Sequence, residues 1–244
     1  MPAYNAAHTL EKTWRDLPRE MIFEIILVDD GSTDKTIPIA KELGLVVFQH
    51  NRNFGYGANQ KTCYTEALKT GADVIVMVHP DYQYDPTLLP KIIEPILAGK
   101  ADVVLGSRMM GLSAFKQGMP WWKYLANKML THLENWVFKL SLSEYHTGYR
   151  AYHRSSLEMV NFRSNSDNFI FDQEIIAQFV EARLRILEVP VPVRYFPEAS
   201  STNFIQSVKY GMGILMLLSR YSVHKHDIWR DPQFEVIQQR YRKA

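Results

Sequence analysis

A histidine and a carboxylate two positions apart follow a short, wholly apolar segment of the chain. Residues 74–78 are five apolar residues in a row, which is typical of a strand buried on both faces of a parallel sheet. His79 and Asp81 come directly after it, where open α/β sheets bind their ligands. These two side chains can share one divalent cation. Alternatively, Pro80 only ends the strand, and Asp81 or Asp85 caps the next helix.

Charged side chains also follow two other predicted strands. The predicted strand 21–28 ends in Asp29 and Asp30, and the predicted strand 102–106 is followed by Ser107 and Arg108. The carboxyl ends of parallel strands line one crevice. Carboxylates hold a divalent cation and arginine binds phosphate oxygens through two parallel hydrogen bonds. The three strand ends together therefore predict a site for a metal-bound diphosphate.

The elements that must position these side chains alternate along the first half of the chain. Strands are predicted over 21–28, 45–50, 74–78 and 102–106, and helices over 35–43, 58–69 and 87–97. Strands that alternate with helices through short connections predict an α/β fold with a mostly parallel sheet and helices on both faces. Gly55-x-Gly57 lacks the third glycine of a dinucleotide-binding motif because Gln60 stands in its place, so an NAD site is not expected.

The second half of the chain is expected to be richer in helix. Helices are predicted over 121–140, 171–184 and 205–222, and strands over 149–153 and 186–195. The apolar stripe of 121–140 is interpreted as core packing, with a lipid-facing role as the alternative. Its residues are Trp122, Leu125, Met129, Leu133, Trp136 and Leu140. The last helix holds an apolar run flanked by Lys209 and Arg220, which fits either a helix on a membrane surface or a terminal helix packed on the core. The expected domains are 1–200 and a helical tail, 201–244.

Composition excludes several functional classes. The chain has 244 residues, a formal net charge of +2 and a single cysteine. A charge this small predicts no nucleic-acid partner, and one cysteine excludes an internal disulfide framework. The first residues have no signal-peptide pattern, and no apolar run approaches the roughly 18 residues that span a bilayer. A cytoplasmic protein, with at most peripheral contact to the cytoplasmic membrane face, is expected.

An ordered set of short motifs resembles family 2 glycosyltransferases, in particular the branch that transfers sugars to dolichyl or polyprenyl phosphate. The set covers roughly residues 2–201, and its specificity lies in the order of the motifs. The motifs are Pro2-Ala-Tyr4-Asn5, Val28-Asp29-Asp30-Gly31-Ser32-x-Asp34, Asp81-x-Gln83, Gly106-Ser107-Arg108, Thr147-Gly148-Tyr149-Arg150-Ala151 and Glu188-Val189-Pro190. The resemblance implies a GT-A fold, inverting transfer from a UDP- or GDP-linked sugar, and Mg²⁺ or Mn²⁺ on the diphosphate. It also implies a role in cell-envelope or polysaccharide biosynthesis.

The resemblance also implies roles for individual residues. Pro2, Tyr4 and Asn5 would border the nucleotide, and Asp29 or Asp30 would accept hydrogen bonds from base or ribose. Asp81 would bind the metal, with His79 as the second candidate ligand. The remaining expected donor-site residues are Gln83 near the sugar and, near phosphates, Arg108, Arg150 and Arg194. A hydroxyl acceptor would need a general base, for which Asp172 and Glu174 are candidates, whereas a phosphate acceptor would need none.

The chain departs from the family pattern in three places. His79-Pro80-Asp81 stands where the family has Asp-x-Asp, and Ala6-Ala7 stands where acidic residues are usual. Only Met1 precedes the Pro-x-Tyr-Asn motif, so we expect either a truncated sequence or a sheet that lacks its first, interior strand. Two alternatives to the lipid-phosphate acceptor follow: transfer to a soluble hydroxyl acceptor, or nucleotide-sugar binding without turnover.

Overall fold

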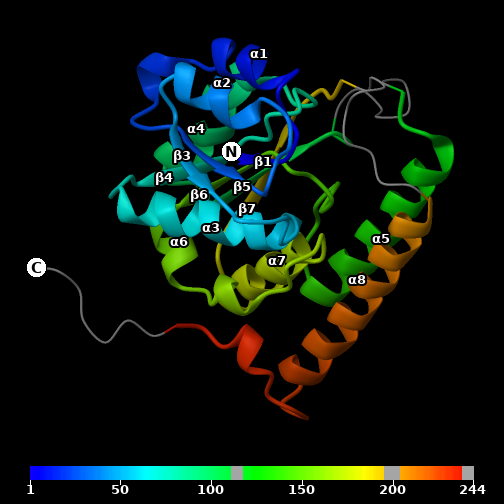
Figure 1. Ribbon diagram of the computed structural model, residues 1–244. Helices are drawn as coiled ribbons and strands as arrows, with labels where there is room; N and C mark the ends of the chain where they lie inside the picture. Colours follow the sequence, from blue (N-terminus) through cyan, green and yellow to red (C-terminus); the bar gives the residue numbers. More distant parts are fainter. Residues whose placement is uncertain (111–117, 195–203, 238–244) are drawn as a thin grey trace, which may run out of the picture.

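The computed structural model describes residues 1–110, 118–194 and 204–237. Its elements alternate as expected through β5, and longer helices follow (Figure 1). The strands are β1 Pro2–Ala3, β2 Ile26–Asp29, β3 Val46–Gln49, β4 Val74–Met77, β5 Val103–Ser107, β6 Arg150–His153 and β7 Ile186–Pro190. The α-helices are α1 Leu10–Arg15, α2 Thr36–Glu42, α3 Tyr56–Lys69, α4 Leu89–Leu97, α5 Trp121–Phe138, α6 Arg154–Glu158, α7 Phe171–Glu181 and α8 Phe204–Lys225. Short 3₁₀ turns are Arg19–Met21, Pro86–Leu88, Phe162–Ser164 and Pro232–Phe234.

The strands form two sheets, and one strand runs against the others. The first sheet has the order β1-β2-β3 and is parallel, whereas the second has the order β4-β6-β5-β7. In the second sheet β6 is antiparallel to both of its neighbours, β4 and β5, while β5 and β7 are parallel. The prediction of an α/β fold is confirmed, but the sheets are mixed. Sequence periodicity does not reveal strand direction, which here depends on the long connection through α5.

Helices cover both faces of the sheets, because neighbouring strand residues point into two different cores. Leu27, Val104 and Ala151 belong to a core that also contains residues of α1, α2 and α4. Their neighbours in the strands belong to a second core, built with α3, α5, α7 and α8. Side chains that alternate across a strand produce this division. Buried residues of α8 share the second core with the sheet. The expected domain boundary at residue 200 stays a prediction.

An apolar slot separates the two sheets. Among the described strands, β4 pairs only with β6, and β1 pairs only with β2. Between β2 and β4 lies a cavity of about 620 Å³, lined by residues 21–26 and 73–78 together with side chains of α3 and α4. The ammonium of Met1 donates a hydrogen bond of 2.7 Å to the Ile26 carbonyl at one end of this slot. The predicted strand 21–28 is therefore shortened to β2, because most of its first half borders the slot instead of a neighbouring strand.

Candidate functional site

Two turns that were predicted to bind a nucleotide lie directly against each other. The Asn5 amide donates to Ser32 Oγ at 2.8 Å, and Asn5 Oδ1 accepts from the Thr33 amide at 2.9 Å. The Asp30 amide donates to the Ala3 carbonyl at 2.8 Å, which continues the β1–β2 ladder. Asn5 has a φ of 50°, a conformation that asparagine tolerates better than most residues. The Tyr4 side chain is 54% exposed beside these turns and remains free to pack against a flat ring.

The carboxylates of Asp29 and Asp30 hold neighbouring loops in place. Asp30 accepts hydrogen bonds from the amides of Phe54 and Gly55, both at 2.9 Å, and contacts His50 Nδ1 at 2.7 Å. Asp29 Oδ2 accepts from the amides that open the following turn, at 3.1 and 2.9 Å. Asp29 Oδ1 is buried and has no hydrogen-bond partner among the described residues. Both side chains therefore hold in place the loops that border the expected nucleotide site.

The histidine after β4 faces an aromatic and acidic neighbourhood. Its ring stacks on Tyr56, with ring centres 5.7 Å apart, and Nε2 lies 3.4 Å from the Tyr56 hydroxyl. That hydroxyl donates to Asp172 Oδ2 at 2.7 Å. Burial lowers the pKa of the His79 imidazole below its ordinary value, more than the carboxylates of Asp81 and Asp172 raise it. The ring is therefore neutral near pH 7, the form that can ligate a metal.

The turn before β6 packs closely against the same histidine. The Gly148 amide donates to the Tyr84 hydroxyl at 3.2 Å, and Thr147 Oγ1 lies 3.3 Å from that hydroxyl. A Cβ atom built on Gly148 would lie 2.8 Å from Cδ2 and Nε2 of His79, closer than van der Waals contact permits. This position accepts only glycine as long as His79 keeps its place.

Gly148→Ala is expected to displace the His79 ring and to weaken nucleotide binding in the presence of Mn²⁺ by about 10- to 100-fold, since displacements near 1 Å at a site cost up to that much. Calorimetric titration measures the affinity. Gly211→Ala in α8 is the matched control, because its Cβ would meet nothing closer than Leu130 Cδ1 at 3.9 Å. Equal affinities in the two variants would contradict a role for the position of His79.

Arg150 and Asp172 form the buried centre of the region. The Arg150 guanidinium is fully buried, lies 3.5 Å from Asp172 Oδ1 and donates to the carbonyls of Thr147, Asp172 and Tyr145 at 2.6, 2.9 and 3.1 Å. Burial lowers its pKa, but Asp172 together with the tyrosines Tyr152, Tyr56 and Tyr64 raises the pKa overall. Gln60 Nε2 also donates to Asp172 Oδ1 at 3.0 Å. The phosphate contact expected of Arg150 and the base role expected of Asp172 stay predictions, and in this structure both groups bind protein partners.

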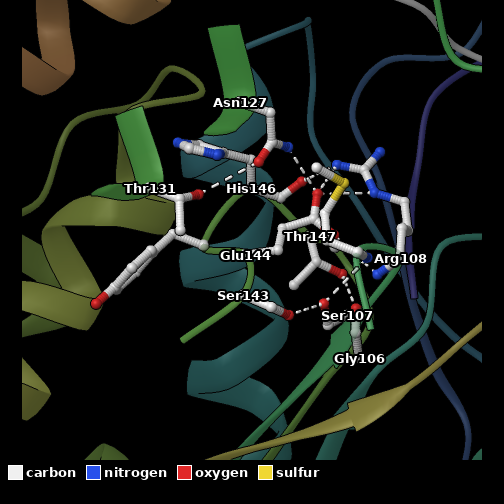
Figure 2. Close-up of polar contacts among 12 residues, drawn as sticks. Gly106, Ser107, Arg108, Asn127, Thr131, Ser143, Glu144, His146 and Thr147 are labelled. Atoms are coloured by element: carbon white, nitrogen blue, oxygen red, sulfur yellow. Dashed lines mark hydrogen bonds and ion pairs between the residues drawn. The ribbon is translucent and has the colours of Figure 1, made fainter. Parts of the chain in front are cut away.

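Arg108 is held by a carboxylate that sequence reasoning did not single out (Figure 2). Its guanidinium forms an ion pair with Glu144, which is fully buried, and Nε donates to Glu144 Oε1 at 2.9 Å. The Arg108 amide donates to Glu144 Oε2 at 2.8 Å, and Asn127 of α5 donates to Oε1 at the same distance. Figure 2 shows these groups converging on Glu144, so this carboxylate fixes the direction of Arg108 and ties it to α5.

The other predicted residues fall on either side of this centre. Arg194 forms an ion pair with Asp85 at 2.8 Å, and its amide donates to the Gln83 carbonyl at 2.9 Å. Asp81 Oδ1 accepts from the Gln83 amide at 3.1 Å, so Arg194 is fixed to the loop that carries Asp81. Glu174 accepts hydrogen bonds from the amide and hydroxyl of Ser166, at 2.6 and 2.9 Å. Its base role stays a prediction.

The residues present suit a metal whose coordination is completed by a substrate. Among the described residues, no cluster of three or more His, Cys, Asp or Glu side chains could enclose an ion. Asp81 and His79 would therefore supply at most two ligands. Mg²⁺ in phosphate-transfer sites is characteristically held by one or two carboxylates plus substrate phosphates, and this donor set fits that arrangement.

Three residues of the candidate site could not be recognised from the sequence alone. Tyr56 and Gln60 lie in the first turns of α3, and Glu144 precedes β6 by a loop. Each meets its partner more than thirty positions away along the chain. The Thr147-Gly148 motif was the one available signal for the turn that contacts His79.

Comparison with solved structures first identifies the fold to which the chain belongs. The structure resembles glucosyl-3-phosphoglycerate synthase from Mycobacterium tuberculosis, solved in complex with Mn²⁺, UDP-glucose and phosphoglyceric acid, with a TM-score of 0.69 and 19% identity. The match covers 91% of this chain and 77% of that chain. This likeness shows the GT-A fold.

The family model described as glycosyl transferase family 2 matches residues 1–160. The chain belongs to glycosyl transferase family 2, and it is a glycosyltransferase that uses a nucleotide sugar. It is 28% identical over 236 residues to UDP-N-acetylglucosamine–dolichyl-phosphate N-acetylglucosaminyltransferase of Methanococcus voltae, covering 89% of this chain and 94% of that protein. It is 26% identical over 174 residues to polyprenol monophosphomannose synthase of Mycolicibacterium smegmatis, covering 68% of this chain and 65% of that protein.

Proposed function

We propose that the protein transfers a sugar, with inversion, from a UDP- or GDP-linked donor to a polyprenyl or dolichyl phosphate. The supporting observation is the direct contact between the Pro2–Asn5 turn and the turn after β2, next to the loop that carries His79 and Asp81. The Methanococcus voltae relative, matched over nearly its whole length, is named for a UDP-sugar donor and a dolichyl-phosphate acceptor. Such an acceptor would bring the enzyme to the cytoplasmic face of a membrane.

In this proposal Tyr4 packs on the base, and Asp29 and Asp30 hold the loops around base and ribose. Asp81 and His79 hold Mg²⁺ or Mn²⁺, which supplies charge neutralisation on the departing diphosphate. Arg108 adds a fixed positive charge, oriented by the buried Glu144. Preorganised charges of this kind stabilise the negative charge that develops in the transition state.

The engagement of both candidate bases supports a phosphate acceptor. Asp172 is bonded to Tyr56 and Gln60, and Glu174 to Ser166. A phosphate oxygen is already a nucleophile and needs no base, whereas a hydroxyl acceptor would require one of these carboxylates to leave its partners. Transfer to a soluble hydroxyl is thus the second candidate, and nucleotide-sugar binding without turnover, motivated by His79, is the third.

The slot between the sheets is part of the same proposal. The start of α3 contacts the end of β2 through Asp30, and α3 ends just before β4, so β2 and β4 run in the same direction. We infer that the slot is the place of a further, interior strand parallel to both. Such a strand would join the half that carries Asp29 and Asp30 to the half that carries His79 and Asp81.

Titration with UDP and GDP, each with Mn²⁺, Mg²⁺ or EDTA, is the first test. We expect one of the two nucleotides to bind with either metal and EDTA to abolish that binding. The metal would link the diphosphate to the protein, because the described residues offer it at most two ligands of their own. The matching nucleotide sugar is then supplied with a short-chain polyprenyl phosphate or with a soluble glycoside. Product on the lipid phosphate supports the proposal, product on the glycoside supports the second candidate, and donor binding without any turnover supports the third.

A further inference from the structure

The outward side of α5 is unusually apolar for a protein surface. Trp121, Leu125, Met129 and Trp136 are each more than 60% exposed. The buried residues of the same helix are Asn127, Thr131, Glu134 and Phe138, which recur at helical spacing on the opposite side. Leu130, Leu133 and Val137 also pack against the core, so α5 carries apolar side chains on both its inward and its outward sides. The interpretation of the predicted stripe as core packing is corrected for Leu125, Met129 and Trp136, whereas Leu133 and Leu140 do pack against the core.

The neighbouring helix α8 repeats this pattern. Ile205, Val208, Met212 and Met216 are each at least 50% exposed. Their spacing places them opposite the buried residues Ile214, Leu217, Leu218 and Tyr221. A surface helix of a globular protein normally turns polar side chains outward, so α8, like α5, is apolar on its outward side as well as on its buried side.

The two exposed stripes form one surface. Helices α5 and α8 lie side by side at one edge of the molecule (Figure 1), with the rings of Phe138 and Tyr221 in edge contact at 5.2 Å. The buried sides of both helices face the same core. Their exposed stripes, being opposite to those sides, must both face away from it. We call this two-helix face the α5–α8 surface. Ile228 and Trp229, just after α8, are also more than 70% exposed.

The exposed charges on the two helices of this surface have one sign. Lys128 of α5 and Lys209 of α8 are exposed beside the stripes, and α8 contains no acidic residue. The single acidic residue of α5, Glu134, is fully buried and lies 3.2 Å from His146. Beyond α8, Asp227 and Asp231 are paired with arginines. Apolar stripes rimmed by cations and free of exposed acids therefore characterise both helices.

We propose that the α5–α8 surface docks on an anionic lipid surface. Helices with tryptophan, leucine and methionine on one face and lysine at the margins lie in the plane of the membrane interface. Tryptophan favours the depth of the lipid headgroups, and lysine is attracted to anionic headgroups. A second copy of the chain fits less well, because a two-fold symmetric contact would bring cations opposite cations. Among the described residues no helix is long and apolar enough to cross a bilayer.

Docking there would place the candidate site close to the headgroups. Asn127 of α5 donates to Glu144, which orients Arg108, so the arginine is joined to the inward side of the docked helix. The docking itself does not depend on the proposed reaction, and it is tested without donor or acceptor.

Flotation with vesicles tests the docking. We expect the protein to bind phosphatidylglycerol vesicles at low salt, to bind phosphatidylcholine vesicles at least about tenfold more weakly, and to be released in part by salt. Met129→Ser with Met212→Ser removes apolar side chains from both stripes, and Lys128→Glu with Lys209→Glu reverses two marginal charges. Each pair of substitutions is expected to weaken binding at least about tenfold. Phe23→Ser is the control, because Phe23 is 83% exposed but lies outside both helices.

Circular dichroism and nucleotide titration establish that each variant is folded. Absence of binding to anionic vesicles by the folded protein would overturn the proposal. Binding that survives both double variants would overturn it as well, because the lipid contact would then lie elsewhere. A dimer that dissociates in the Met129→Ser, Met212→Ser variant, with no vesicle binding by the unmodified protein, would assign the surface to a second copy instead.

Discussion

Replacing Arg150 by methionine is expected to lower the free energy of unfolding by about 3–5 kcal/mol, the usual cost of leaving one partner of a buried ion pair alone. Methionine fills part of the space but offers no donor. Asp172 would lose its cationic neighbour, and three buried carbonyls would lose the guanidinium that now donates to them. Urea denaturation followed by circular dichroism measures the change.

Two controls separate the buried charge from the loss of any arginine. Arg15→Ala removes an exposed pair with Glu11 and is expected to leave the denaturation midpoint unchanged, since such pairs contribute little. Adding Asp172→Asn to Arg150→Met is expected to recover part of the lost stability, because the uncompensated carboxylate is gone. If the double variant is less stable than the sum of its parts predicts, Asp172 is not the group that Arg150 compensates.

Asp81→Ala is expected to reduce glycosyl transfer by about 100- to 1,000-fold, the range found when a preorganised electrostatic contact to the developing charge is lost. The reason is that Asp81 is the one carboxylate in the loop after β4 that is proposed to hold the metal. Nucleotide binding should at the same time become insensitive to the choice between Mn²⁺ and EDTA. Initial rates with saturating donor, together with calorimetry, measure both effects.

Asp73→Asn is the matched control for Asp81. Asp73 is an exposed carboxylate directly before β4, at the opposite end of the same strand, and the variant should transfer sugar at the unmodified rate. Transfer by Asp81→Ala at near-normal rates, still inhibited by EDTA, would place the metal elsewhere. Loss of activity in both variants would indicate damage to β4 rather than loss of a ligand.

Local sequence patterns predicted a helix or strand well where the residues of that segment alone determine it. The buried strands β4 and β5 and the helices between them follow from apolar runs and turn residues. The direction of β6 could not be predicted, since a strand that runs antiparallel reads like one that runs parallel. Core packing was wrongly predicted for Leu125, Met129 and Trp136 of α5 for a related reason. Apolar periodicity identifies a face of a helix, but it does not tell whether protein or another apolar phase covers that face.

The candidate site was predictable only where it lies at strand ends. Asp29 is the last residue of β2, and His79 and Arg108 come just after β4 and β5; parallel strands bring such ends to one edge. Tyr56 and Glu144 were missed because nothing in their local sequence marks them. Their importance arises from partners that are distant along the chain, Asp172 and Arg108, and such contacts are a property of the folded chain.

The slot between β2 and β4 divides the structure into two units that can unfold separately. Backbone hydrogen bonds bind β1, β2 and β3 into one unit and β4, β6, β5 and β7 into another, while packing through α3 and the cores joins the two. Units of this kind can open separately, each with its own free energy. The turns after β1 and β2 that are proposed to bind the nucleotide belong to one unit, and the loop with Asp81 belongs to the other. A ligand that contacts both units would therefore couple their opening, so that two separate opening reactions become a single cooperative one.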